Sequence, residues 1–152
     1  MATRVDAREI LGCNCLRIRR TARRITVMYD ETMAPTGLTV GQFGILAQLY
    51  GFASFGRPSV PAGTLAERRD LDPTTLSRTM KPLQAQGLIR FRRDPDDGRV
   101  RLIELTDAGE KQFLRGVPYW RAAQQNLDKL LGRVTSASLS DILDQTLSKI
   151  AA

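Results

Sequence analysis

"DLDPTTLSRTMKPLQAQGLIRFRRDPDDGRVRLIEL", residues 70–105, combines the signals of one amphipathic helix and two short strands. Asp72 suits the N-cap of a helix, and Pro73 suits its first turn, where the missing N–H costs no hydrogen bond. Gly87 suits the position just after the helix, where a left-handed backbone is common. The apolar side chains that recur at i, i+4 and i+7 and predict a buried stripe are Leu76, Met80 and Leu83. Pro82 removes one helical hydrogen bond, so we expect it to kink or tighten the last turn.

Two runs of alternating residues follow this helix, "GLIRFRR" at 87–93 and "RVRLIEL" at 99–105. They flank "DPDDG" at 94–98, a composition typical of tight turns, and together they predict a β-hairpin. The aspartates give this arginine-rich hairpin a shaped tip. Asp97 lies two residues before Arg99 and is expected to hold the Arg99 guanidinium as a bidentate partner.

Most of the remaining sequence carries helical signals. Thr39 and Gln42 suit a capping box at the start of one helix. Thr106 suits the N-cap of another, which we expect to be interrupted near 116–118, where glycine and proline are close together. The expected helices cover residues 7–33, 39–50, 61–69, 72–87, 107–132 and 138–150, with a loop over 51–60. The order is α-α-α-α-β-β-α-α, and two short helices followed by a hairpin predict a winged helix-turn-helix within a mainly α fold.

The composition fits one domain with a basic surface. The chain has 152 residues, of which 42% are hydrophobic, enough for one core. Its net charge is +7 and its pI about 10.1, which favours a polyanion partner, although a basic protein without such a partner has the same composition. No stretch approaches the roughly 20 apolar residues of a membrane span, and the N-terminus lacks an apolar signal core. We therefore expect a cytoplasmic protein that does not contact the membrane.

The absence of histidine weighs against an enzyme. Without it, neither a Ser-His-Asp triad nor the commonest zinc sites can form. The only two cysteines, Cys13 and Cys15, are too close in the chain for an ordinary structural disulfide, and no cofactor motif is present. We expect no catalytic, metal or cofactor site, and a thiol enzyme that uses Cys13-Asn14-Cys15 is a remote alternative.

Three segments of the chain resemble the MarR family of bacterial transcriptional regulators. They are "LTVGQFGILAQL", "LAERRDLDPTTLSRTMKPLQAQGLI" and "RRDPDDGRVRLIELTDAGEK", and the last is the most specific because it joins the hairpin to an "LTxxG" helix start. The resemblance implies one domain, residues 1–152, that forms a homodimer. Its DNA-binding lobe would be residues 36–105, and its dimerisation helices would be residues 1–35 and 106–152. Pro82 and the long loop at 51–60 depart from the family pattern.

The resemblance also implies which residues contact double-stranded DNA. The helix at 72–87 would enter the major groove, and the hairpin tip with Arg99 would enter the minor groove of a pseudo-palindromic operator. The residues that these two elements would contribute to DNA binding are Thr74, Thr75, Ser77, Arg78, Lys81, Arg93, Asp97 and Arg99. Arg92, Arg93 and Arg101 would contact phosphates or form intrachain pairs. The simpler alternative is an ordinary amphipathic helix with a polar face and a solvated hairpin.

Two kinds of inducing signal remain open. Many family members bind aromatic carboxylates or phenols between the dimer helices and the DNA-binding lobe. Residues that could hold such an effector here are Arg19 for the carboxylate and Phe43, Leu46 and Trp120 for the ring. Another branch senses organic peroxides through a cysteine followed by a tyrosine fourteen residues later, a spacing that Cys15 and Tyr29 match, although Arg19 replaces a second aromatic. We expect a repressor released by an aromatic ligand, with a Cys15 peroxide sensor as the alternative and a non-specific architectural DNA protein as a third.

Overall fold

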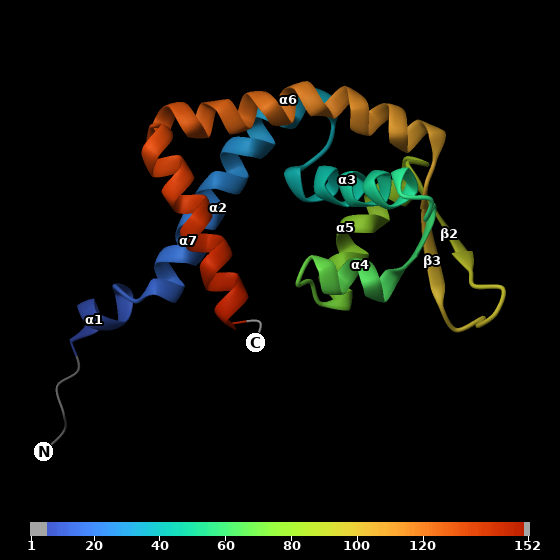
Figure 1. The fold of residues 1–152 in the computed structure, drawn as a ribbon, viewed down its shortest axis with the longest axis horizontal. Helices are drawn as coiled ribbons and strands as arrows, with labels where there is room; N and C mark the ends of the chain where they lie inside the picture. The colour runs from blue at the N-terminus through green and yellow to red at the C-terminus, as the bar shows by residue number, and fades with distance from the viewer. Residues whose placement is uncertain (1–5, 151–152) are drawn as a thin grey trace, which may run out of the picture.

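The computed structural model describes residues 6–150 and places a small mixed lobe beside a set of long helices (Figure 1). The elements in chain order are α1 (Ala7–Leu11), α2 (Asn14–Met33), η1 (Ala34–Thr36), α3 (Val40–Ser54), β1 (Ser59–Pro61), α4 (Ala62–Arg68), α5 (Pro73–Ala85), β2 (Ile89–Arg93), β3 (Arg101–Leu105), α6 (Asp107–Leu131) and α7 (Arg133–Ile150). α6 runs along one edge of the molecule and joins the lobe of α3–α5 and the hairpin to α2 and α7. The predicted winged helix-turn-helix in a mainly α fold is confirmed.

The wing is a three-stranded antiparallel sheet in the order β1-β3-β2. Ile89 pairs with Leu105 and Arg93 with Arg101, so the predicted hairpin is confirmed. β1 was not expected, because residues 51–60 read as a loop. α3 instead continues to Ser54, and Val60 pairs with Ile103, where both side chains are fully buried. A three-residue strand is too short to show the alternation by which strands are recognised.

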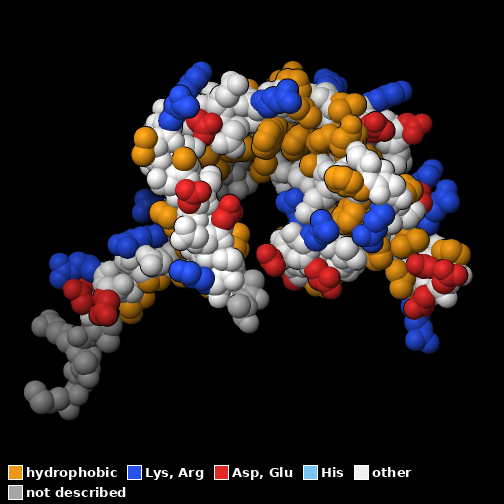
Figure 2. All heavy atoms as spheres, in the orientation of Figure 1, with side chains coloured by type: hydrophobic (Ala, Val, Ile, Leu, Met, Phe, Trp, Pro, Cys, Tyr) orange, Lys and Arg blue, Asp and Glu red, His pale blue; other side chains and the backbone are white. Residues whose placement is uncertain are grey.

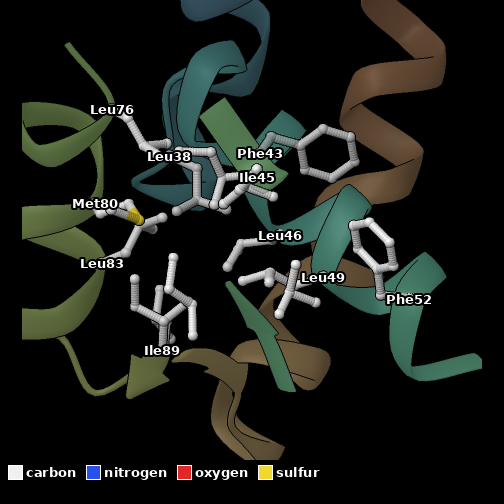
Figure 3. Packing of buried hydrophobic residues seen from close by; sticks show 14 of the residues in the cluster. Leu38, Phe43, Ile45, Leu46, Leu49, Phe52, Leu76, Met80, Leu83 and Ile89 are labelled. Atoms are coloured by element: carbon white, nitrogen blue, oxygen red, sulfur yellow. The ribbon is translucent and has the colours of Figure 1, made fainter. Parts of the chain in front are cut away.

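The core of the lobe lies between α3, α5 and the sheet (Figure 3). The predicted stripe of α5 is buried, with Leu76, Met80 and Leu83 at 2%, 5% and 0% exposure. These side chains pack toward Ile45, Leu46 and Leu49 of α3 (Figure 3). Because the apolar stripe fixes which side of α5 faces the core, it also fixes which side faces solvent.

The helices outside the lobe differ from the expectation in three places. The expected helix over 7–33 is broken at Gly12, whose N–H bonds to the Arg8 carbonyl oxygen and ends α1, while Cys13 takes an extended conformation as the N-cap of α2. α6 is not interrupted, because a proline at position 118 lacks only one hydrogen bond and glycine at position 116 lets the helix lie against the Phe43 ring. α7 begins at Arg133, earlier than expected.

α5 ends close to where the sequence predicts. Its last residue is Ala85, and Gln86 donates a hydrogen bond to the carbonyl oxygen of Pro82. Gly87 has a φ of 68°, a left-handed conformation that glycine adopts without strain, and this turns the chain into β2. Across residues 6–150, none of the helices has the length and apolar character that a membrane span requires.

Candidate nucleic-acid interface

The solvent-facing side of α5 carries the polar residues that the sequence singled out. Asp72 caps the helix and accepts hydrogen bonds from the backbone N–H of Thr75 at 2.9 Å and from its hydroxyl at 2.5 Å. These hydrogen bonds lower the pKa of the Asp72 carboxyl. The residues that are exposed on this side are Thr74, Ser77, Arg78 and Lys81. Thr75 is half-buried and its hydroxyl proton is committed to the cap, so it differs from the others in the group.

The aspartates at the hairpin tip hold the backbone. Asp94 accepts hydrogen bonds from the N–H groups of Asp96 at 2.8 Å and Asp97 at 3.3 Å. Asp97 accepts from the backbone N–H of Arg99 at 3.0 Å. The expectation that Asp97 holds the Arg99 guanidinium is therefore wrong, because its carboxylate is turned to the backbone. The acids shape the turn, and the Arg99 side chain extends into solvent.

Glu104 joins the strands at the base of the wing. It is buried, accepts a hydrogen bond from the Ser59 hydroxyl at 2.5 Å and forms ion pairs with Arg90 at 2.6 Å and Arg92 at 3.3 Å. The Ser59 hydrogen bond, followed by Arg90 and Arg92, lowers the pKa of Glu104 despite its burial. Arg92 is thus an intrachain partner, one of the two roles expected for it.

Two further arginines of the wing differ in their surroundings. The Arg101 guanidinium lies 4.2 Å from the centre of the Phe91 ring, which ties it to the hairpin. Arg93, at the end of β2, is exposed and forms no ion pair within residues 6–150. The same holds for Arg99. Among the described residues, Arg93 and Arg99 are therefore exposed and without an ion pair, while Arg92 and Arg101 make contacts within the wing.

A cavity of about 550 Å³ lies between α3 and α6. Its lining residues are Val40, Phe43, Gly44, Ala47, Arg69, Phe113, Val117, Trp120 and Arg121. The Phe43 ring stacks with Phe113 at 5.2 Å and with Trp120 at 6.4 Å between ring centres. Figure 2 shows hydrophobic side chains gathered where α6 passes over the lobe of α3–α5. An aromatic wall with two guanidinium groups suits a planar, negatively charged molecule.

The cavity contains only part of the predicted effector site. Phe43 and Trp120 line it together, as expected. Leu46 is fully buried in the lobe core and lies outside the cavity wall. Arg19 is exposed on α2 and also does not line the cavity, whereas Arg69 and Arg121 do. In sequence, Arg69 stands in "AERRD" and resembles a solvated charge, so only the fold identifies it.

Relatives share the lobe and the whole architecture. A family model described as "MarR family" matches residues 36–100, which run from the start of the lobe through β2 to the hairpin loop and end before β3. The transcriptional regulator MosR of M. tuberculosis, solved in complex with DNA, is 31% identical, with 91% of this chain and 97% of that chain covered and a TM-score of 0.74. The chain belongs to the MarR family. This is a family of winged helix-turn-helix transcriptional regulators and not of enzymes.

Two more transcriptional regulators extend the comparison. The uncharacterised HTH-type transcriptional regulator YdgJ of Bacillus subtilis (strain 168) is 28% identical over 80 residues, which are 53% of this chain and 46% of YdgJ. The chain therefore matches less than half the length of this curated relative. PcaV of Streptomyces coelicolor, solved with its natural ligand, shares the fold at 24% identity and a TM-score of 0.76, with 96% of this chain and 97% of that chain covered.

The residues suggested for peroxide sensing in this MarR-family protein lie far apart within one chain. Cys13 and Cys15 are both exposed at the start of α2. Tyr29 is buried near the other end of the helix, about 21 Å from Cys15 at 1.5 Å per residue. Its hydroxyl donates to Gln124 at 2.7 Å, and burial together with the charge of Asp128 raises the Tyr29 pKa. Tyr29 therefore joins α2 to α6, and it can reach a Cys15 thiol only on a second chain.

Proposed function

We propose that the protein is a homodimeric, sequence-specific DNA-binding repressor that a small aromatic ligand releases from its operator. The observation that carries this proposal is the exposed row of α5 residues beside the wing arginines. α4, α5 and the hairpin tip lie toward one edge of the molecule, away from α6 (Figure 1). When this edge lies against a DNA duplex, Arg78 reads base edges in the major groove and Arg99 inserts into the minor groove. Arg93 and Lys81 neutralise phosphates.

Apolar side chains on the long helices support a dimer. The large hydrophobic residues that are more than 40% exposed on α1, α2, α7 and the end of α6 include Ile10, Leu11, Ile18, Val27, Leu130, Val134, Ile142, Leu143, Leu147 and Ile150. A second copy would remove this surface from water. It would also supply a second α5 for the other half-site, which a two-fold symmetric operator places about 34–36 Å away.

Substituting the two groove-reading arginines tests the repressor. We expect Arg99→Ala and Arg78→Ala each to weaken binding by about 1–3 kcal/mol, and Arg78→Ala also to relax the base preference within each half-site. The melting temperature should not change, because both side chains are exposed. Fluorescence anisotropy with a duplex that the wild type selects from a random library measures the loss. Arg115→Ala, an equal charge change at an exposed position of α6, is the control. Full affinity in both variants would refute this DNA-binding surface.

The effector that the cavity best fits is an aromatic carboxylic acid or phenol. Its volume falls within the roughly 300–1,000 Å³ of small-molecule sites, its walls are aromatic, and two arginines offer charge to an anion. Arg121 and Arg69 replace Arg19 in this role. PcaV, a relative of the same fold, was solved with its natural ligand, which supports a ligand site in this architecture.

Duplex release tests the effector. We expect benzoate or a hydroxybenzoate to release the selected duplex from the wild type, and Trp120→Ala to need at least about tenfold more ligand, because the variant loses one aromatic wall. Trp120 is 37% exposed, so the variant should fold. Arg19→Ala is the matched control, since Arg19 does not line the cavity, and it should respond as the wild type does. Loss of the response in Arg19→Ala with full response in Trp120→Ala would place the effector elsewhere.

The alternative signal, oxidation of Cys15 by an organic peroxide, is supported by one observation. The Cys15 thiol is exposed in the first turn of α2, where a peroxide can reach it, and Arg19 lies one turn further on. The hydrogen bond that the Tyr29 hydroxyl donates to Gln124 weighs against the peroxide sensor, because Tyr29 then does not donate to Cys15. Release of the duplex by micromolar cumene hydroperoxide from the wild type and from Cys13→Ser, but not from Cys15→Ser, would establish the peroxide sensor in place of the aromatic-ligand repressor.

A further inference from the structure

Arg69 reaches from the helix-turn-helix into the effector cavity. It is the C-cap of α4 and the first residue of the turn that leads to α5. Its guanidinium lies directly on the backbone of α3 at Gly44, where an added Cβ would come within 2.9 Å of Nη2 and closer still to Nη1. Only a glycine at position 44 leaves room for this placement. One side chain thus bridges the DNA-reading motif and the cavity wall.

The guanidinium of Arg69 lacks a partner of opposite charge. Its Nε is buried and makes no hydrogen bond, and within residues 6–150 no carboxylate lies at ion-pair distance. Burial lowers the pKa of Arg69, which shows that its surroundings oppose the charge. A buried donor without an acceptor is unfavourable, and an anion in the cavity would relieve it. A carboxylate suits the planar fork of an arginine, which can donate two parallel hydrogen bonds.

The turn after Arg69 has little freedom. Asp70 has a φ of 48°, and it is the only non-glycine residue with a positive φ in the described part of the chain. The backbone N–H groups of Asp70 and Leu71 bond to carbonyl oxygens of Glu67 and Ala66, at 3.2 and 3.0 Å. Asp72, the next residue, is already the N-cap of α5. The turn that joins the Arg69 backbone to α5 is thus short and internally hydrogen-bonded, so a shift of the backbone at residue 69 would move the start of α5.

We propose that Arg69 couples the cavity to α5: a carboxylate bound beside it draws the guanidinium off Gly44, and the turn at residues 69–72 moves with it and weakens DNA binding. This inference rests on the proposed repressor function and names the residue by which its effector acts. With the cavity empty, the contact at Gly44 holds the turn against α3 and keeps α5 in the pose that binds DNA. The coupling operates within one subunit, apart from any change in the spacing of the two subunits.

A variant that displaces Arg69 without any ligand tests the coupling. In Gly44→Ala the new methyl group occupies the place of the guanidinium, which can move because it is the far end of a flexible side chain. Alanine favours a helix more than glycine does, so α3 should keep its stability. We expect Gly44→Ala to bind the duplex selected by the wild type about tenfold more weakly, a common size for an allosteric coupling, with an unchanged or higher melting temperature.

The double variant shows whether the effect passes through Arg69. In an Arg69→Ala background there is no guanidinium to displace, so adding Gly44→Ala should leave DNA affinity as it is in Arg69→Ala alone. Gly51→Ala is the matched control on the same helix, because nothing lies within 4 Å of its added Cβ, and it should bind as the wild type does. Wild-type affinity in Gly44→Ala, or an equal loss with and without Arg69, would overturn the coupling.

The fluorescence of Trp120 measures binding of the anion to the cavity separately from DNA binding. Trp120 is the single tryptophan of the chain and lines the cavity, so its fluorescence should be quenched by benzoate, not by neutral benzamide, and not at all in Arg69→Ala. Equal quenching by both probes, or none by benzoate, would overturn the role of Arg69 as the carboxylate partner. If the wild type selects no duplex from the library, the repressor and the coupling both fail. If it selects one and the double-variant result is additive, only the coupling fails.

Discussion

Gly109→Ala is expected to lower the free energy of unfolding by about 3 kcal/mol, the upper part of the range for overpacked positions. Gly109 is buried in the first turn of α6, and an added Cβ would overlap the carbonyl oxygen of Leu88 and lie 2.8 Å from Cδ1 of Leu105. The carbonyl group is backbone and cannot turn aside as a side chain could. Relief requires moving α6 away from the start of β2, which separates the lobe from the helix that carries it.

The hydrogen bonds around Gly109 show why the two elements cannot separate cheaply. The Thr106 hydroxyl donates to the carbonyl oxygen of Gly87 at 2.7 Å and accepts from the Gly109 N–H at 3.0 Å. The Thr106 N–H bonds to the Leu88 carbonyl oxygen at 3.1 Å. The "LTxxG" sequence is therefore a packed joint between α6 and the turn after α5.

Urea unfolding followed by circular dichroism measures the loss in Gly109→Ala. Gly63→Ala in α4 is the control, because nothing lies within 4 Å of its added Cβ, and it should unfold within about 0.5 kcal/mol of the wild type. Unfolding of Gly109→Ala at the same urea concentration as the wild type would contradict the close approach of Leu88.

The parts of the fold that the sequence predicts are those determined by neighbouring residues. Asp72 and Thr39 form the expected caps, and Gly87 takes the expected left-handed conformation. The hairpin follows from turn residues between alternating runs. Each of these signals acts within a few residues of its element, so it is visible without knowledge of the fold.

The features that the sequence could not supply depend on distant contacts. β1 forms because Val60 pairs with Ile103, which lies more than forty residues away in the chain. Position 118 remains helical because α6 is held along its length by α2 and α3, which outweighs the local preference of proline. Arg69 becomes a cavity residue only when the fold brings its guanidinium onto Gly44 of α3, while Arg19, chosen from its place in the sequence, stays on the surface.

The wing arginines show, in one short segment, a role that follows from a distant contact and a position that follows from the local turn. Arg92 and Arg99 are the same residue type, and each lies two residues from an aspartate in the sequence. Arg92 points to the side of the sheet where Glu104 is buried and forms an ion pair with it, whereas Arg99 sits at the tip and is exposed. Register across the strands, and not local composition, separates an arginine that stabilises the wing from one that stays exposed at its tip.

Introducing charge on α7 should have the largest effect on DNA binding. Leu143→Glu together with Leu147→Glu places two carboxylates in the exposed apolar stripe of α7, where a second copy would have to desolvate them. We expect monomers, and a loss of affinity for the selected duplex of about a thousandfold, because one α5 per particle binds with little more than non-specific strength. Analytical ultracentrifugation and anisotropy measure the two effects.

A matched variant separates loss of the dimer from added negative charge. Gln145→Glu with Ser148→Glu brings the same charge to exposed polar positions on the other face of α7, about half a turn from the stripe, and should leave a dimer that still binds. Added salt should weaken DNA binding by both variants, because the release of counterions is less favourable at higher salt, but only the stripe variant should lose its dependence on two half-sites. A duplex with one half-site removed tests this dependence on two half-sites. The wild type should bind it far more weakly than it binds the full site. The stripe variant should bind both duplexes equally. Equal binding by the wild type would mean that a single lobe suffices, and the apolar stripe would then need another partner.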